Sequence, residues 1–233
     1  TKEANIEALK NFDKAIEADS SNAQAYAWKV CTLGQAMFRG FSDKSLDEIM
    51  SEAKVNIDKA LELNENDFEC HRMLSAVYLS NHEYALAEDH GLKAFNMVPN
   101  DPRVLSGYGE VLVRVGKVDK GLELLNKAYE LDPIPQGQST SDNRIKDLIL
   151  GYFFANDFTK VIELSFDLRI TDLRSLVLIL YSRSKLDQDV KLSKEYKSFK
   201  EEFKDTDWVQ AIDRFHIKDS TIQKDLDTFI NSI

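Results

Sequence analysis

The feature that most constrains the fold of this chain is a short polar turn that returns at a fixed interval. The segment Leu63–Asp67 returns as Met97–Asp101 and again as Leu131–Pro135, with a step of 34 residues each time. An earlier version, Ala18–Asn22, stands upstream at a longer interval. A period of this length is the signature of repeat proteins, in which each unit packs on its neighbours. We therefore expect a stack of similar units that share one continuous core.

The segments between the turns carry a helical pattern. Before one turn, the small residues Ala87, Gly91 and Ala94 recur at the spacing i, i+4 and i+7, and the other turns are preceded by the same spacing. This spacing places the three residues on one helix face, where small side chains let a neighbouring helix approach closely. Gly109 and Gly121 suit the same purpose in the next unit. Only nine glycines and four prolines in 233 residues leave few breaks between helices, which predicts an all-α fold.

The charge and composition exclude several classes of function. Lys and Arg number 30 against 40 Asp and Glu, which gives a net charge of −10, whereas a dedicated nucleic-acid binder needs clustered basic residues. No apolar run approaches the ~18 residues that a membrane-spanning helix needs. Two cysteines do not make a disulfide framework and fit a reducing cytoplasm. We therefore expect a cytoplasmic protein without nucleic-acid binding or membrane insertion.

Two adjacent copies of the unit, 68–101 and 102–135, follow each other without a gap. A 34-residue helix–turn–helix with small, aromatic and proline residues at these places resembles the tetratricopeptide repeat (TPR). The resemblance implies a right-handed superhelical TPR solenoid of antiparallel helix pairs. It covers residues 1–205 with about five to six repeats, and the first copy begins at its second helix.

The resemblance weakens on both sides of the two clean copies. An enlarged repeat at 23–67 carries an insertion of about eleven residues. Gly40 interrupts the helix there, and Ser45 with Glu48 has the spacing of a capping box that starts the next helix. Degenerate repeats follow at 143–205. Decay of this kind is expected near the ends of a stack, because terminal repeats present a polar outer face.

Residues 206–233 form a tail beyond the repeats, which we expect to be a capping helix. Ser220 and Gln223 have capping-box spacing and lead an apolar pattern typical of a helix. Two roles are open for this tail. It closes the last repeat as a cap, or it lies in the groove as a self-ligand against Phe153 and Phe154.

The TPR resemblance also implies where a ligand would bind. It implies that the concave face is lined mainly by the first helix of each repeat, at the second, fifth, ninth, twelfth and thirteenth places of each copy. In the enlarged and first clean repeats these places hold Gln24, Ala27, Cys31, Gly34, Gln35, Glu69, Arg72, Ala76, Leu79 and Ser80. In the next two repeats they hold Arg103, Ser106, Glu110, Val113, Arg114, Asn143, Lys146, Leu150, Phe153 and Phe154.

Charged and aromatic side chains at these places form a candidate peptide-binding groove: Arg72, Arg103, Glu110, Arg114, Lys146, Phe153 and Phe154. Arginine suits carboxylates, and a buried aromatic residue suits an interface anchor. One hypothesis is therefore a groove for an acidic or C-terminal peptide segment with apolar anchors. The alternative is that the arginines pair with neighbours such as Glu69 and Glu110 on an ordinary solvated face.

The sequence shows no pattern typical of catalysis or metal binding. Cys70, His71, His82 and His90 are its one soft-ligand cluster, and their spacing differs from that of zinc sites. The segment Gly107–Gly109 lies within a helical pattern rather than in a phosphate-binding loop after a strand. No serine stands in a nucleophile motif. We expect no enzyme activity, no cofactor and no metal in this chain.

A second resemblance concerns the wider protein. The opening segment Ala25–Trp28, the enlarged repeat, the two clean repeats and the tail from Phe215 are similar to the C-terminal repeat region of bacterial adenylate/guanylate cyclases and related signal regulators. This implies a regulatory or assembly region of a larger bacterial signalling protein. We therefore expect a non-catalytic scaffold that binds a peptide or protein. The alternative is a self-association module that joins two parent chains into a homodimer and binds no separate ligand.

Overall fold

The computed structural model describes residues 1–38, 40–134 and 142–233, and all regular structure within these ranges is helical. The α-helices are α1 (Lys2–Ala18), α2 (Ala23–Phe38), α3 (Leu46–Leu63), α4 (Phe68–Ser80), α5 (Tyr84–Met97), α6 (Pro102–Arg114), α7 (Val118–Leu131), α8 (Asn143–Phe154), α9 (Phe158–Ser165), α10 (Leu173–Lys185), α11 (Lys194–Glu201), α12 (Trp208–Asp213) and α13 (Ser220–Ser232). A 3-10 turn, η1 (Val190–Leu192), precedes α11. The expected all-α class is confirmed.

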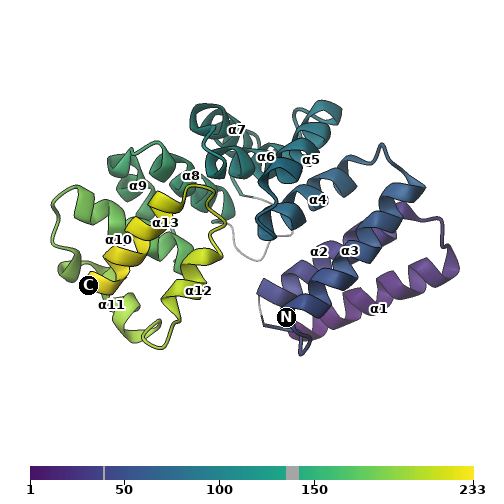
Figure 1. Ribbon diagram of the computed structural model, residues 1–233, viewed down its shortest axis with the longest axis horizontal. Helices are drawn as coiled ribbons and strands as arrows, with labels where there is room; N and C mark the ends of the chain where they lie inside the picture. The colour runs from purple at the N-terminus through teal and green to yellow at the C-terminus, as the bar shows by residue number, and fades with distance from the viewer. Residues whose placement is uncertain (39, 135–141) are drawn as a thin grey trace.

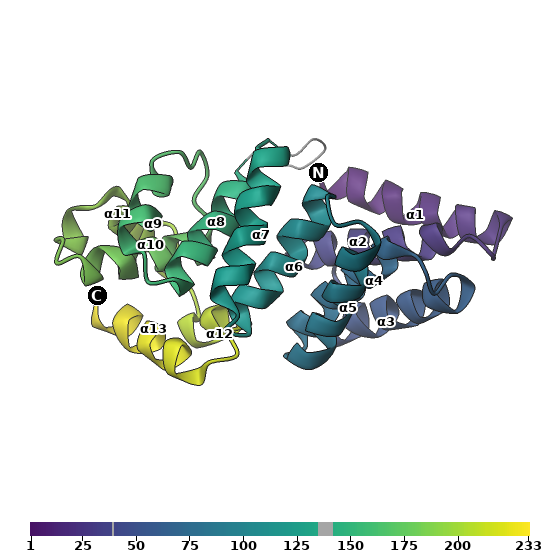
Figure 2. The ribbon, with the colours of Figure 1, turned by 90° about the horizontal axis from the view of Figure 1, so that it is seen from above.

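Consecutive helices pair, and the pairs stack on one another. The most extensive contacts lie within the pairs α6–α7, α4–α5 and α2–α3, and α8–α9 continues the series. Figures 1 and 2 show the pairs following one another round an arch, with α1–α3 at one end and α8–α13 at the other. This arrangement confirms the solenoid of antiparallel helix pairs.

The first helix of each pair lies on the inner side of the arch. In the described part of the chain, α2 contacts α4, α4 contacts α6, α6 contacts α8 and α8 contacts α10. The second helices α3, α5, α7 and α9 make no comparable contacts with one another there. Elements on the inside of a curve approach each other more closely than those outside it. The concave face is therefore built from the first helices, as the resemblance implied.

Most of these first helices end at a residue with a positive φ angle. His82 (60°), Gly116 (91°) and Asn156 (58°) follow α4, α6 and α8, and the same conformation recurs at Gly40 and Asp187. The next backbone N–H then bonds back five residues, as from Lys117 to Leu112 over 2.9 Å. This is a Schellman turn, which satisfies carbonyls at the end of a helix. Asn156 stands thirteen residues after Asn143, just as His82 and Gly116 stand thirteen residues after Glu69 and Arg103, which occupy the same place in their repeats.

Glycines bring the paired helices close together. A Cβ atom at Gly121 would lie 2.7 Å from Val113 Cγ1 and 2.9 Å from the Gly109 carbonyl oxygen. A Cβ atom at Gly91 would lie 2.6 Å from Tyr108 Cδ2. Real Cβ atoms do not approach so closely, so α6–α7 and α5–α6 pack at a separation that only glycine permits. The close helix contacts expected at these glycines are confirmed.

Two predicted caps have different outcomes. The capping box of α3 is present, since Ser45 Oγ accepts from the Glu48 N–H and Glu48 accepts from the Ser45 N–H over 2.8 Å. The cap predicted at Ser220 is wrong. Asp219 is the N-cap of α13, and its carboxylate accepts from the Thr221 N–H over 2.8 Å. The helix starts one residue earlier because an aspartate side chain satisfies its free N–H groups equally well.

The larger part of the core lies in the second half of the molecule. One continuous apolar cluster runs from Val113 in α6 through the fully buried residues of α10 to Leu226 and Ile230 in α13. Smaller clusters lie between α2, α3 and α4 and between α6 and α7. The pair α12–α13 is thus a structural part of the C-terminal half. Among the described residues, no helix has both the length and the apolar character needed to cross a bilayer.

Candidate functional site

The inner side of the arch contains an apolar pocket between α2, α3 and α4. Its volume is about 250 Å³, and most of its lining side chains are apolar. Six of its lining residues stand at places that the TPR resemblance assigns to the concave face: Cys31, Gly34, Gln35, Arg72, Ala76 and Ser80. The structure thus gathers expected groove positions from two successive repeats around one cavity. We refer to it as the α2–α4 pocket.

Small and flexible residues keep the α2–α4 pocket open. A Cβ atom added at Gly34 would meet no heavy atom within 4 Å, so the α2 wall is free at that point. Ala76 is nearly as short, and Met50 and Met73 line the pocket with unbranched side chains that adapt to irregular shapes. Burial raises the pKa of the Cys31 thiol, which therefore stays neutral. These walls suit an apolar side chain of a ligand.

Two of the predicted groove cations, Arg72 and Arg103, share one buried carboxylate. Arg72 Nη2 lies 2.8 Å from Glu69 Oε2, and Arg103 Nη1 lies 2.5 Å from Glu69 Oε1. Arg103 also donates over 2.7 Å to Asp101, the N-cap of α6. Glu69 is only 3% exposed, and a buried carboxylate needs such partners. This is the pairing that the alternative interpretation of the sequence predicts.

Glu110 and Arg114 of α6 form an ion-pair group with α10. Glu110 Oε1 lies 3.4 Å from Arg114 Nη2 and 3.1 Å from Arg174 Nη1. Burial alone would raise the pKa of the Glu110 carboxyl, but the two guanidinium groups outweigh burial and lower it. The Arg114 side chain is only 4% exposed. Arg114, expected to face an open groove, is instead covered by other parts of the chain.

Lys146 of α8 and its neighbour Asp147 also have partners on other helices. Lys146 Nζ lies 3.0 Å from Asp172 Oδ2, and Asp172 is the N-cap of α10. Asp147 accepts a hydrogen bond of 2.5 Å from Ser106 Oγ. Burial and the nearby charge of Glu110 raise the pKa of Asp147 to about 6. Lys146 and Asp147 are buried, whereas Asp172 is partly exposed, and their contacts connect α6, α8 and α10.

Phe153 and Phe154 do not line an open groove, which corrects the expectation from the sequence. Phe153 is 4% exposed and Phe154 9%, and both belong to the large C-terminal core. Their rings pack edge to face with a centroid distance of 5.7 Å, and Phe153 also contacts Tyr181 of α10 at 5.5 Å. Tyr181 in turn contacts Phe229 of α13 at 5.3 Å. The two phenylalanines are buried because α10 lies against α8, and α13 lies against α10.

The pair α12–α13 reaches back to the end of α6 through residues 215–218, which we call the strap. Arg114 Nε donates over 2.9 Å to the carbonyl of Phe215, and the Lys218 N–H donates over 3.2 Å to the Arg114 carbonyl. His216 Nδ1 lies 3.0 Å from His82 Nε2. The tail is therefore more than a cap, because it covers one of the residues expected in the groove. No periodic signal in the sequence could place it there.

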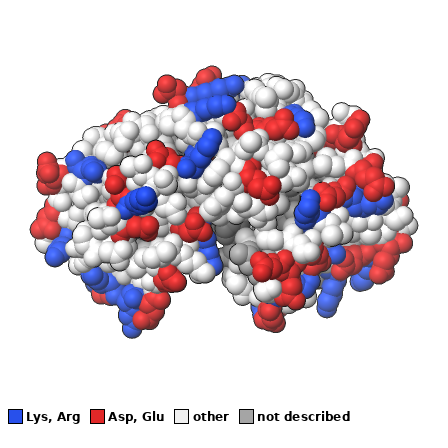
Figure 3. Space-filling model, viewed as in Figure 1, with Lys and Arg blue, Asp and Glu red and all other residues white. Residues whose placement is uncertain are grey.

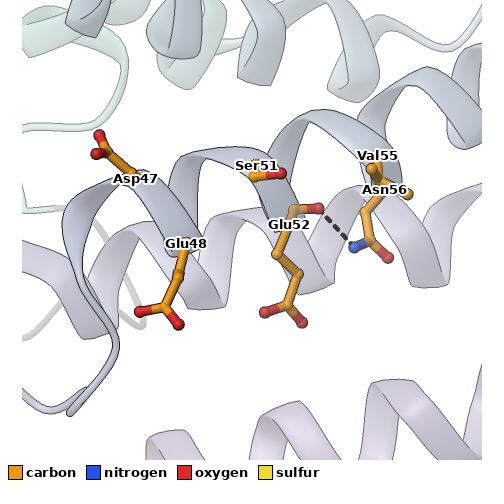
Figure 4. Close-up of a pocket in the computed structure, with 6 residues that line it drawn as sticks. All are labelled: Asp47, Glu48, Ser51, Glu52, Val55 and Asn56. Carbon is orange, nitrogen blue, oxygen red and sulfur yellow. Dashed lines mark hydrogen bonds between the residues drawn. The ribbon is translucent and has the colours of Figure 1, made fainter.

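A wider hollow lies on the outer side of α3 and is shown in Figure 4. It measures about 540 Å³ and is lined by Asp47, Glu48, Ser51, Glu52, Val55 and Asn56. Asn56 Nδ2 donates over 2.7 Å to the Glu52 carbonyl within the helix. All of these residues belong to one helix, and in the described ranges no other element contributes a lining residue. We therefore take the α2–α4 pocket as the candidate site.

The histidines pair with one another rather than gather around a metal position. His71 Nδ1 lies 2.8 Å from His90 Nδ1, and His71 Nε2 contacts the Glu65 carbonyl at 2.9 Å. Burial and nearby Asp67 raise the pKa of the Cys70 thiol to about 12, which keeps it protonated. In the described ranges no group of three or more His, Cys, Asp or Glu side chains is arranged to hold a metal ion.

Comparison of the sequence with known proteins does not identify a family for this chain. No family model matches it. The U-box domain-containing protein 70 of Oryza sativa subsp. japonica is 26% identical over 128 residues, which is 54% of this chain. The chain spans only 16% of the length of that curated relative.

Comparison of the structure is more informative. YrrB, a TPR protein with an unusual peptide-binding site, matches 78% of this chain and 84% of its own with a TM-score of 0.50 and 22% identity. This chain has the TPR fold. MamA from Desulfovibrio magneticus RS-1 overlaps 71% of this chain and 88% of its own, with a TM-score of 0.48 and 21% identity. Yeast Tom70 overlaps 96% of this chain and 42% of its own, with a TM-score of 0.49 and 15% identity.

Proposed function

We propose that this chain is a non-catalytic protein-interaction scaffold that binds a peptide segment in the α2–α4 pocket. The observation that carries the proposal is the pocket itself. It is mostly apolar, it lies on the concave side, and six of its lining residues stand at places that the TPR resemblance assigns to ligand binding. YrrB, which shares the fold, has a peptide-binding site of its own, and this supports a similar role here.

The size of the pocket favours a peptide over a small metabolite. Its volume of about 250 Å³ lies below the range of ~300–1,000 Å³ that is usual for small-molecule sites. It offers few convergent polar groups, whereas a metabolite site needs several to fix its ligand. An apolar side chain fits the space, with its peptide backbone running past Gly34 and Ser80 along the groove. The ligand is therefore a segment of another protein with an apolar anchor residue.

An acidic residue beside this anchor is part of the proposal. Arg72 lines the pocket, and Arg103 lies next to it in space through their common partner Glu69. The side chain of Arg103 is partly exposed and retains free donor capacity for a ligand carboxylate. Because Glu69 already neutralises part of this charge, we expect acidic residues to add selectivity more than affinity.

Peptide selection from a random library tests the proposal, and Gly34 supplies the matched pair of variants. Gly34→Leu places a side chain in the pocket, and we expect it to weaken selected peptides at least tenfold. Gly34→Ala adds a single methyl group in open space and should bind them like the unchanged chain. Peptides that bind all three proteins equally would show that the pocket is not the site.

Self-association of the parent protein is the second candidate function. The side chains of Phe166 and Ile170 are 68% and 56% exposed in the connection between α9 and α10, and exposed apolar residues of this kind favour contacts between chains. A scaffold in a larger bacterial signalling protein of the cyclase type, with a cytoplasmic location, also stays a prediction. The encoded sequence upstream of Thr1 tests the parent protein, and light scattering tests the dimer.

A further inference from the structure

The last helical pair does not continue the stack of the solenoid. α13 lies against α10, whereas α12 makes its principal contacts with α13. The turn between them carries the strap, residues 215–218, back to the end of α6. Figure 1 shows α13 crossing in front of α10 rather than following it along the arch, with α12 below α8. If α12 and α13 continued the stack of helix pairs, the surface at the end of α6 would be open on the inner side of the arch. The strap covers this surface instead.

The strap is held in the way that a bound peptide is held. Both of its hydrogen bonds to Arg114 use strap main-chain groups, the Phe215 carbonyl and the Lys218 N–H. The accepting Arg114 carbonyl is one of the unpaired carbonyls at the end of α6, which need a donor from elsewhere. Phe215 and Ile217 are buried to 3% and 4% exposure and supply two apolar anchors. Main-chain bonds with alternate side-chain anchors are a general mode of peptide recognition.

The residue between the anchors makes the strap an imperfect occupant. His216 has a φ of 53°, in the left-handed region that glycine and asparagine accept more easily. Its ring contacts His82, which has a φ of 60°. The groups that face it are Arg114 and Arg174 from the helices beneath, His82, and Asp213 from α12. Two positive side chains and a histidine thus surround a partly exposed imidazole, which favours a less basic residue at this place.

We propose that the surface beneath the strap, formed by Arg114, the carboxyl end of α6 and His82, is a second peptide-binding site that the chain fills with its own strap. The partner is a short segment with two apolar residues separated by glycine or asparagine, which binds there after the strap is released. This site is separate from the α2–α4 pocket and does not depend on the function proposed for that pocket.

A labelled peptide with the sequence of residues 212–219 and the change H216G is the probe, and fluorescence anisotropy with the full chain is the measurement. In the strap variant, Phe215→Ala with Ile217→Ala, both anchors are lost. We expect the probe to bind this variant at least tenfold more tightly than the unchanged chain, in which the strap competes. Val209→Ala, at an exposed position of α12, is the matched control and should bind like the unchanged chain.

Two results would overturn the proposal. The first is equal affinity of the probe for the strap variant and the unchanged chain. The second is no binding to a folded strap variant. A probe in which both anchor residues are alanine should not bind, and if it binds as well as the first probe, the anchors do not determine recognition.

Hydrogen exchange of the unchanged chain gives a second test if the strap variant does not fold. We expect the amides of the strap and of α13 to exchange through a partial opening, faster than the buried amides of α8 and α10. Exchange of the strap only together with α10, at the rate of global unfolding, would make α12–α13 a permanent cap and would refute the proposal.

Discussion

Gly34 and Gly121 are both helical glycines, but their absent side chains serve opposite purposes. At Gly121 a Cβ atom would collide with Val113 and with the backbone of α6, so the glycine is needed for packing. At Gly34 a Cβ atom would meet nothing within 4 Å, so the glycine only leaves space in the α2–α4 pocket. The contacts that an added Cβ atom would make thus distinguish Gly121, which is needed for packing, from Gly34, which leaves space for a ligand.

Alanine at Gly121 should destabilise the fold. The added methyl group forces α6 and α7 apart, and overpacking of this kind costs about 1–3 kcal/mol. Gly107→Ala is the control, because its Cβ atom would come no closer than 3.9 Å to Arg72 Cγ. Alanine is the better helix former by about 0.5–1 kcal/mol, so the control should be neutral or stabilising. Urea unfolding measures both, and equal stability of the two variants would contradict the packing role.

His216 should make the strap sensitive to acid. Burial, together with the charges of Arg114 and His82, lowers its pKa from the ordinary 6.5 to about 4. As the pH falls, His216 is therefore protonated in the unfolded chain at a higher pH than in the folded chain. The stability that the folded chain gains from neutral His216 is complete above pH 6.5. It is lost progressively between pH 6.5 and about 4.

Hydrogen exchange of the strap at a series of pH values, corrected for intrinsic rates, measures this loss. His216→Asn is the matched control, since asparagine accepts a positive φ and does not titrate. The difference in the corrected exchange rate of the strap amides between the unchanged chain and His216→Asn should be constant above pH 7 and should grow towards pH 4. A difference that does not change with pH would exclude His216 as the titrating group.

At the scale of the elements, the capping box of α3 should contribute measurably to the free energy of unfolding. Ser45→Ala removes the acceptor for the Glu48 N–H, and losing such a cap typically costs about 0.5–2 kcal/mol. Ser51→Ala, at an exposed position of the same helix, is the control and should change little. Thermal unfolding compares the two variants. Equal midpoints would mean that α3 is held by tertiary packing alone.

Local patterns in the sequence predicted most of the helices and the order of the pairs. The spacing of Ala87, Gly91 and Ala94 and the capping box at Ser45 depend on residues within one or two turns of each other, so a sequence reveals them. Of the left-handed turns, the sequence predicted only the break at Gly40, because four of the six described residues with a positive φ are not glycines: His82, Asn156, Asp187 and His216. Polar residues with a positive φ carry no comparable signal.

The candidate site was predicted in one half of the molecule and misplaced in the other. Around α2 and α4 the expected places do gather at a pocket, with Gly34 and Arg72 among its walls. Farther along, Arg114, Phe153 and Phe154 are covered, because α10, α13 and the strap lie over them. The contact between His82 and His216 joins residues 134 positions apart. Periodicity within a repeat carries no information about how a chain folds back over itself.

At the scale of the whole molecule, the two ends of the arch differ in what their inner side offers. Figure 3 shows many acidic side chains over the α1–α3 end, with basic side chains among them. The α2–α4 pocket lies at the first end, and its walls come from α2, α3 and α4. The second end holds the strap. The two binding sites that we propose thus lie at different places along one solenoid.

The scaffold proposal predicts that the chain is a monomer. Static light scattering should give the mass of a single chain, 26.6 kDa, at all concentrations. Replacing Phe166 and Ile170 by serine should then leave the mass unchanged. A mass twice as large that resists dilution, and that these replacements abolish, would favour the self-association alternative.

The measurement that tests the central claim most directly is an NMR map of the full chain with a selected peptide. Binding in the α2–α4 pocket should shift the amide signals of Cys31, Gly34, Ala76 and Ser80 by far more than those of the outer face of α3 around Ser51. The same peptide should shift none of them in Gly34→Leu. Shifts confined to the outer face of α3, or unchanged by the leucine, would contradict the concave groove as the binding site.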